Sequence, residues 1–248
     1  MEELRLSPLE FKNIIDYESI IGHGNFGTII TYKDKLLKID NYLFSKIKNN
    51  NSYYSKKIIE DYYKNDIRDF DDKKQIEYLS NIQKNVKLTK LPEGIITLKE
   101  VDSKIMNVSP GIILPYHKEH QKLEKLPLDN YKSILIILRK LLLSLRELEE
   151  NKISQEDLAS YGEDCVIYDR KYNVLCKDET PEIIDMDGFY VKVGDNFVSC
   201  DNMYREFCNI ILDYYYFYGI KSNIIRGTIT SYDESFALLK RLEHEKKR

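Results

Sequence analysis

The 248-residue chain contains no tryptophan and only ten glycines, six prolines and four cysteines. The cysteines form no C-x-x-C pair, so the ligand spacing typical of a zinc site is missing. We expect free thiols, although Cys165 and Cys176 could face each other across a hairpin in "CVIYDRKYNVLC". The scarcity of glycine makes any cluster of glycines worth a physical explanation.

The chain also lacks a strong charge of one sign and a long apolar run. Its net charge of −3, from 38 Lys and Arg against 41 Asp and Glu, gives no overall basic field for nucleic acid or an anionic membrane. No apolar run approaches the about 20 residues needed to cross a bilayer. Nothing at the N-terminus resembles a secretory signal. We expect a cytoplasmic protein that binds neither nucleic acid nor membrane, and the sequence predicts no oligomeric state.

Three of the ten glycines lie together in "IGHGNFGTII", as Gly22-x-Gly24-x-x-Gly27. Glycine amides can close around a phosphate because no side chain blocks the approach, but the same spacing also occurs in ordinary turns. A dinucleotide-binding loop would lead directly into a helix, whereas β-branched residues follow Gly27 here. No Gly-Lys-Ser/Thr follows, which excludes a Walker A loop. The pattern instead predicts a glycine turn between two strands.

The N-terminal part of the chain is predicted to be mostly β with one principal helix. Alternation predicts a three-stranded meander in which Lys33 and Asp34 form the second turn. The residues at about 41–75 form a polar, partly helical insertion with an asparagine-rich tip. The predicted elements are strands at 17–22, 27–32 and 33–39, a helix in 73–86 with Ile76, Leu79 and Ile82 on one face, and strands at 95–101 and 111–117.

The C-terminal part is predicted to be mainly helical. The long, nearly continuous apolar surface of residues 131–149 predicts a buried helix. A last helix begins with a capping box at Ser231 and Glu234. Between them we expect a loop at 151–164, a strand-turn-strand at 165–178, a short strand in "PEIIDMDG" and a second buried helix at 201–218.

Four charged residues stand where phosphoryl transfer would need them. The chemistry needs a phosphate cradle, a cation on the phosphates, a carboxylate on magnesium and a carboxylate facing the acceptor hydroxyl. Lys38 lies on the third strand of the meander, and Glu77 on the first predicted helix could form its ion pair, with Glu60 as a competitor. Asp157 follows the long helix, and Asp185 ends a buried strand. The alternatives are a solvated lysine, a solvated helix glutamate and a plain Asp-Gly turn.

The order and spacing of these features resemble the protein-kinase-like fold over roughly residues 17–218. The resemblance implies an α+β, bilobal architecture. A small antiparallel β-rich N-lobe would comprise residues 1–116, and a reduced, mainly helical C-lobe would comprise residues 117–248.

The resemblance also implies a role for each matching residue. Gly22, Gly24 and Gly27 would cover the phosphates of ATP, with Phe26 at the tip of the hairpin. Lys38 would pair with Glu77. A hinge at 114–117 would bind adenine, and its candidate contacts are Leu114 and Tyr116. Asp157 would be the catalytic carboxylate and Asp185 the magnesium ligand.

The chain departs from the family's pattern at three places. Gln155-Glu156-Asp157 stands where the family has His-Arg-Asp or His-Gly-Asp. Gly162 stands where a magnesium asparagine is expected, so the next candidate ligand is Asp164. The Asp-Phe-Gly motif reads Asp-Met-Asp-Gly at 185–188, and only a short segment without Ala-Pro-Glu precedes the helix at 201.

Two functions remain open from the sequence. The first is an ATP- and Mg²⁺-dependent kinase that transfers the γ-phosphoryl group to a hydroxyl acceptor, with a protein serine or threonine favoured over a small molecule. The second is a pseudokinase, a nucleotide-binding interaction module without phosphotransfer. The four charged residues favour the enzyme, whereas the altered catalytic loop and short activation segment favour the pseudokinase.

Overall fold

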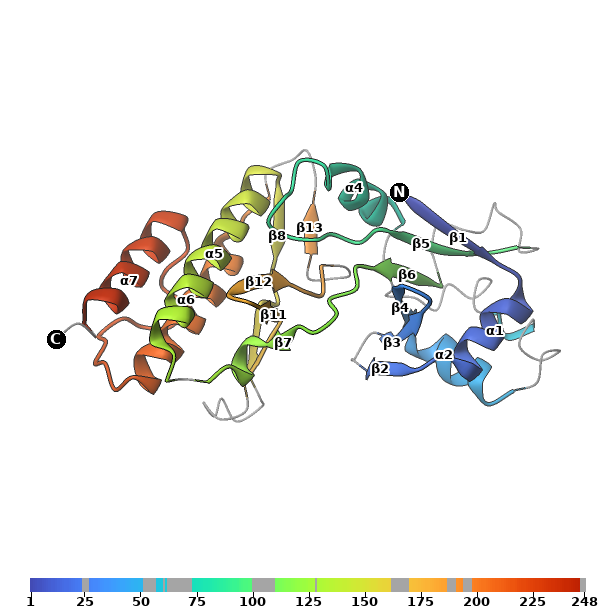
Figure 1. Ribbon diagram of the computed structural model, residues 1–248. Coiled ribbons are helices and arrows are strands. Elements are labelled where there is room, and N and C mark those ends of the chain that lie inside the picture. The colour runs from blue at the N-terminus through green and yellow to red at the C-terminus, as the bar shows by residue number, and fades with distance from the viewer. Residues whose placement is uncertain are drawn as a thin grey trace. The chain divides into compact units, whose positions relative to one another are not determined.

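A computed structural model of the chain shows an α+β protein (Figure 1). It describes residues 1–23, 27–50, 57–59, 61, 73–99, 110–127, 129–161, 170–186, 191–193 and 198–245. These residues form two compact units. The N-terminal unit holds those of 1–83 and 91–116, and the C-terminal unit those of 84–90, 117–186 and 191–245.

The N-terminal unit is built on a six-stranded sheet with the order β1-β5-β6-β4-β3-β2. Its strands are β1 (Glu2–Leu6), β2 (Ile20–His23), β3 (Gly27–Tyr32), β4 (Lys35–Asp40), β5 (Gly94–Leu98) and β6 (Gly111–Leu114). Strands β2, β3 and β4 form the predicted antiparallel meander, which is thereby confirmed. Lys33, with a φ of 57°, forms the turn between β3 and β4.

The prediction of a purely antiparallel sheet is wrong, because β1 pairs with β5 in parallel. Parallel pairing requires a long connection, and here everything from α1 to α4 lies between the two strands. Helix α1 (Pro8–Tyr17) begins with a full capping box, in which Ser7 and Glu10 bond each other's backbone N–H groups. The sequence Ser-Pro-x-Glu is thus a helix N-terminal signal, and it was not among the predicted ones.

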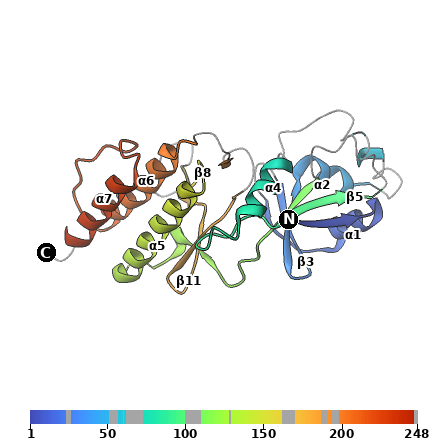
Figure 2. The same ribbon diagram turned by 90° about the horizontal axis from the view of Figure 1, so that it is seen from above.

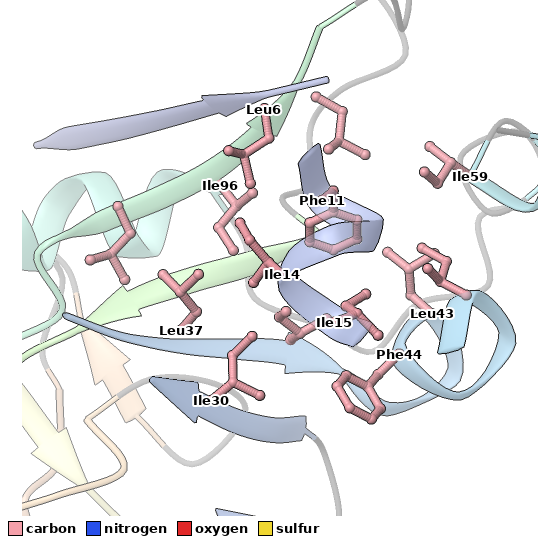
Figure 3. Packing of buried hydrophobic residues seen from close by; sticks show 14 residues of the cluster. Leu6, Phe11, Ile14, Ile15, Ile30, Leu37, Leu43, Phe44, Ile59 and Ile96 are labelled. Carbon is pink, nitrogen blue, oxygen red and sulfur yellow. The ribbon is translucent and has the colours of Figure 1, made fainter. Parts of the chain in front are cut away.

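Helices α1 and α2 (Asn41–Lys48) cover one face of the sheet (Figure 3). Phe11, Ile14 and Ile15 of α1 lie between sheet side chains such as Leu37 and the apolar side chains of α2. Helix α2 opens the predicted polar insertion and is amphipathic, with Leu43, Phe44 and Ile47 buried. The N-terminal unit therefore has more than the one principal helix predicted.

The other face of the sheet carries Lys38. Leu37 and Ile39 belong to the cluster under α1, so strand alternation places Lys38 on the opposite face of β4. Helix α4 (Lys73–Ile82) packs along β5 and adds no described residue to that cluster, although its Ile76 and Leu79 are fully buried. We infer that α4 lies on the Lys38 face. The predicted helix, with Ile76 and Leu79 on its buried side, is confirmed.

The C-terminal unit is built around α5 (Tyr131–Glu150), α6 (Asp201–Phe217) and α7 (Tyr232–Glu245), which pack against one another (Figure 2). These three helices confirm the predictions for 131–149, 201–218 and the C-terminal segment. Ser231 and Glu234 bond each other at the start of α7, as the capping box predicts.

Small sheets pack against α5 and α6, with orders β12-β11-β7, β10-β9 and β13-β8. Their strands are β7 (Gln121–Lys122), β8 (Ile153–Gln155), β9 (Ala159–Tyr161), β10 (Arg170–Tyr172), β11 (Val174–Lys177), β12 (Thr180–Ile183) and β13 (Val191–Val193). Of the predicted strand-turn-strand at 165–178, residues 165–169 lie outside the described residues, and β11 matches the second strand. Strands β10 and β11 belong to different sheets, because β10 pairs with β9 and β11 pairs with β12 and β7.

The short segment 84–90, between α4 and β5, belongs to the C-terminal unit. The carboxylate of Glu147 on α5 accepts the N–H groups of Lys87 and Leu88, at 2.9 and 2.7 Å. Val86 and Thr89, on either side, are almost fully buried. Two successive amides on one carboxylate fix this segment to α5.

The described cysteines and helices bear on two of the predictions, free thiols and no membrane span. Cys176, Cys200 and Cys208 are free and buried, and Cys165 lies outside the described residues. None of the described helices combines the length and the apolarity that a membrane span requires.

Candidate active site

The glycine hairpin and Lys38 meet within the N-terminal unit. Gly27 begins β3, and β3 pairs with β4 so that Ile29 lies opposite Lys38. A Cβ atom added to Gly27 would lie only 2.8 Å from Cγ of Lys38. The lysine stem therefore occupies the space that a side chain at Gly27 would need. Gly22 differs, because a Cβ there would approach no atom of the described residues closer than 3.7 Å. Gly24 and Phe26 lie outside the described residues.

A chain of polar groups braces the base of this hairpin. His23 ends β2, and its Nδ1 lies 2.8 Å from the hydroxyl of Thr28, which is fully buried. The Thr28 hydroxyl donates to Oδ1 of Asn41, the first residue of α2, at 2.8 Å. The two strands of the hairpin are thus joined to the helix that follows β4. This fixes the strand that carries Lys38 relative to the hairpin.

Lys38 is itself buried, with only 6% of its surface exposed. A buried ammonium group must be paired to remain charged. Glu77, the predicted partner, lies half-buried on α4 in the same unit. The competing candidate, Glu60, lies outside the described residues.

The predicted hinge follows the sheet directly. Leu114 is the last residue of β6 and is half-buried, and Tyr116 is 41% exposed. His117 begins the C-terminal unit, and its Nδ1 is buried without a hydrogen-bond partner among the described residues. Burial, together with the nearby charges of His120 and Lys90, lowers the pKa of His117 to about 4.

In the C-terminal unit, Gln155 connects the two predicted catalytic carboxylates. It ends β8 and is fully buried. Its Nε2 donates to the backbone carbonyl of Asp185 at 3.2 Å, and its Oε1 accepts the backbone N–H of Asp157. Both ends of the amide are therefore used, and Gln155 fixes two distant segments to each other.

Asn173 makes a second connection between the same segments. Its Nδ2 donates to the backbone carbonyl of Asp157 and, at 3.2 Å, to the Asp157 carboxylate. Its backbone N–H donates to Leu158 and its carbonyl accepts the N–H of Ile184, both at 2.9 Å. The segments that carry Asp157, Asn173 and Asp185 are thereby joined by hydrogen bonds, although they are separate in the sequence.

Asp185 adopts a strained backbone conformation at this junction. Its φ of 57° is in the left-handed region, which few non-glycine residues adopt. Aspartate tolerates it better than most residues, and such strain gathers at functional sites. The residues after Met186, including Asp187 and Gly188, lie outside the described residues.

A third acid, Glu206 on α6, supports the loop after Asp157. Its carboxylate accepts the N–H of Ala159 at 2.6 Å. The pKa of Glu206 is raised to about 7, mainly by burial and also by the charge of Asp157, against the lowering effect of the hydrogen bonds from Ala159 and Leu158. Glu206 thus changes its charge close to neutral pH beside the predicted catalytic residue.

Glu156, which directly precedes Asp157, forms an ion pair. Its Oε2 lies 2.7 Å from Nζ of Lys192 on β13, and the Glu156 side chain is 13% exposed. Strand β13 pairs with β8, so Lys192 lies opposite Ser154. The segment that follows Asp185 is therefore joined to the Asp157 loop by both a strand pair and an ion pair.

Asn173 and Glu206 were not among the predicted site residues. Asp164, the predicted second metal ligand, and Gly162, which stands at the expected asparagine position, lie outside the described residues. A signal for Asn173 was present, because it directly precedes the buried strand β11 in "YNVLC". The hairpin β9–β10, inserted between Asp157 and Asn173, concealed it.

These groups can act as hydrogen-bond acceptors, as a base and as ligands for a hard cation. Within the part of the chain that the structure describes, no three His, Cys, Asp or Glu side chains come together in a way that could hold a metal ion. The chain matches no protein-family model, and no curated protein is significantly similar to it.

Proposed function

We propose that the protein is an ATP- and Mg²⁺-dependent phosphotransferase with a protein-kinase-like fold of two lobes, acting on a hydroxyl acceptor. The observation that carries the proposal is the junction at Asn173, which binds the Asp157 loop and the strand that leads to Asp185. It ties together the segments that carry Asp157 and Asp185, which supports a site in which two carboxylates and an amide would act together, as phosphoryl transfer requires.

The order of elements supports the same proposal. The glycine hairpin β2–β3 is followed by β4 with Lys38, α4 with Glu77, β6, the long helix α5, the Asp157 loop and the strand before Asp185. This is the order that the kinase resemblance implies. The packing of the Lys38 stem against Gly27 adds a physical reason for a glycine at that position.

The available donors suit Mg²⁺ and not a softer ion. Carboxylate and amide oxygens are its preferred protein ligands, and a site that also uses nucleotide phosphates needs only one or two carboxylates. Asp185 and Asn173 would hold the ion, and the Oδ1 of Asn173 accepts no hydrogen bond from a described residue. We therefore propose Asn173 in place of Asp164 as the second ligand. Bound Mg²⁺ would neutralise charge on the phosphate oxygens.

The chain's own residues would then position the reactants. Lys38 and the amides of the glycine hairpin bind phosphate, and Leu114 and Tyr116 contact the adenine. Asp157 accepts the proton of the acceptor hydroxyl, and its position is fixed by the bonds from Gln155 and Asn173. Catalysis by such a site is mainly positioning and electrostatic stabilisation.

The test is transfer of label from γ-labelled ATP with Mg²⁺, supported by thermal shifts with ATP. Lys38→Ala, Asp157→Asn and Asp185→Ala should each abolish transfer. Lys35→Ala on the same strand, which removes an ion pair with Glu2, and Asp178→Asn in an exposed turn should both retain it. ATP at 100 times its Kd should add about 2.7 kcal/mol of stability.

The outcomes separate the two functions. Stabilisation by ATP without transfer or hydrolysis would contradict the enzyme and leave the nucleotide-binding module. The absence of both stabilisation and transfer would contradict both.

A further inference from the structure

Asp213 is a fully buried carboxylate in the middle of α6. A buried charge is costly unless it is paired and hydrogen-bonded. Two groups bind it. The hydroxyl of Tyr172 donates to Oδ2 at 2.7 Å, and the guanidinium of Arg226 binds Oδ1. Both carboxylate oxygens are thus engaged.

Arg226 reaches Asp213 from the surface. It lies in the segment between α6 and α7, and its side chain is 40% exposed. Its Nη1 also donates to the backbone carbonyl of Asn209, one turn earlier on α6, at 3.3 Å. The Arg226 guanidinium therefore bonds to both a backbone carbonyl and a side-chain carboxylate of α6.

Tyr172 connects this pair to the candidate active site. It is 2% exposed, ends β10 and directly precedes Asn173. In the β9–β10 pair it lies opposite Ala159, whose N–H is bound by Glu206. Glu206 and Asp213 are seven residues apart, two turns of α6, and so share one face of the helix. Each acid holds one strand of the hairpin that separates Asp157 from Asn173.

The need to fill the buried space at position 172 does not explain the tyrosine hydroxyl or the buried ion pair. A phenylalanine at position 172 would fill the same space, and apolar replacements of buried ion pairs are often neutral or stabilising. What the polar groups add is a fixed orientation for the residue that follows. The hydroxyl fixes Tyr172 to the helix, and the amide of Asn173 is one residue away.

We propose that Tyr172, Asp213 and Arg226 form a positioning network for Asn173, with Arg226 as its surface end. None of the three is a catalytic residue, because they act through Asn173. The metal-dependent part of this inference rests on the proposed function, whereas the positioning part does not.

The first test uses the protein without nucleotide. Tyr172→Phe removes one hydroxyl, and Tyr215→Phe is the matched control. Tyr215 is also buried, and its hydroxyl donates at 3.1 Å to Leu238 of α7. NMR would follow hydrogen exchange of the Asn173 side-chain NH₂, assigned by its absence in Asn173→Ala. Exchange should rise about fivefold in Tyr172→Phe and stay unchanged in Tyr215→Phe.

The second test is the Mg²⁺ dependence of phosphotransfer. In Tyr172→Phe, the Mg²⁺ concentration for half-maximal rate should rise about 10-fold, with the KM for ATP at saturating Mg²⁺ unchanged. Arg226→Gln should behave in the same way, and Arg226→Lys, which keeps the charge, should remain close to wild type. If Arg226→Gln fails to fold, Tyr172→Phe still decides.

The two proposals fail in different ways. Equal exchange of the Asn173 amide in Tyr172→Phe and Tyr215→Phe overturns the positioning network, whatever the nucleotide chemistry. Faster exchange in Tyr172→Phe supports the network even if the wild type proves unable to transfer phosphate, which overturns the proposed function alone. Faster exchange with an unchanged Mg²⁺ dependence overturns the link to the metal.

Discussion

The glycine hairpin of the N-terminal unit and the acidic junction of the C-terminal unit are held together by different forces. Gly27 and Lys38 lie on neighbouring strands and meet by close packing. Asp157, Asn173 and Asp185 come from separate segments and are joined by hydrogen bonds, some of them through Gln155. A substitution in the hairpin should therefore act by disturbing side-chain packing. A substitution in the junction should act by disturbing the hydrogen bonds around the proposed catalytic groups.

The largest effect is expected from Asn173→Ala. It removes the bonds from the side-chain amide to Asp157 and one proposed metal ligand, so the phosphotransfer rate should fall roughly 10²- to 10³-fold. Steady-state kinetics with a Mg²⁺ titration measure this loss. The control is Asn151→Ala, which also loses an amide bond to a backbone carbonyl, but at the C-terminus of α5. Equal rates for the two variants would show that the junction is not used in catalysis.

Glu206→Gln tests whether the junction depends on pH. Because the pKa of Glu206 is raised from 4.5 to about 7 in the folded protein, the native state holds more protons than the unfolded state between those values. The contribution of Glu206 to the stability of the folded protein is therefore present below pH 4.5 and is lost as the pH rises through 7. The glutamine variant should be about 2 kcal/mol more stable than wild type at pH 8 and no more stable at pH 4.

Urea unfolding at both pH values measures this difference. Glu234→Gln is the control with the opposite sign, because hydrogen bonds from Thr230 and Ser231 lower the pKa of Glu234. That variant should lose stability at pH 8 and lose none at pH 3. A stability difference between wild type and Glu206→Gln that does not change with pH would mean that the pKa of Glu206 is the same in the folded and unfolded states.

Gly27→Ala tests the hairpin. The new methyl group would lie 2.8 Å from Cγ of Lys38 and displace the lysine stem, at a cost of about 1 to 2 kcal/mol. Gly22→Ala is the matched variant, because its methyl group has room. Thermal unfolding should therefore separate the two. If Gly22 approaches phosphate, its variant should bind ATP more weakly at unchanged stability. Equal stability of both variants would contradict the packing of Lys38 under Gly27.

The smallest effect is expected at the pair of Glu156 and Lys192. The lysine is 58% exposed, so the pair contributes about 0.5 kcal/mol or less. Lys192→Glu places two like charges together and should lose about that amount in urea unfolding at low salt. The double variant Glu156→Lys with Lys192→Glu should regain it. No recovery in the double variant would show that the two charges do not interact.

Local pattern predicted the elements but not the contacts between distant segments. Local apolar patterns were sufficient for the meander, α4, α5 and α6, because such patterns express burial. The bond from Asn173 to Asp157 spans 16 residues, and the bond from Ala159 to Glu206 spans 47. Nothing near Asn173 or Glu206 in the sequence indicates such partners, so they emerge only when the chain is folded.

The parallel pairing of β1 also escaped prediction, for a related reason. No turn or helix cap in residues 2–6 indicates which strand they pair with, and β5 lies far along the chain. The capping box at Ser7 would have located α1, however, and with it the strand that precedes it.

The anchoring of residues 84–90 by Glu147 has a practical consequence for dividing the protein. The chain passes between the two units after residues 83, 90 and 116, so neither unit is one continuous stretch of sequence. A fragment that ended at Tyr116 would keep residues 84–90 but lose α5, to which they are bound. A fragment that began at His117 would keep α5 but lose residues 84–90. Separate expression of the two units would need a circularly permuted or grafted chain, not a cut at a linker.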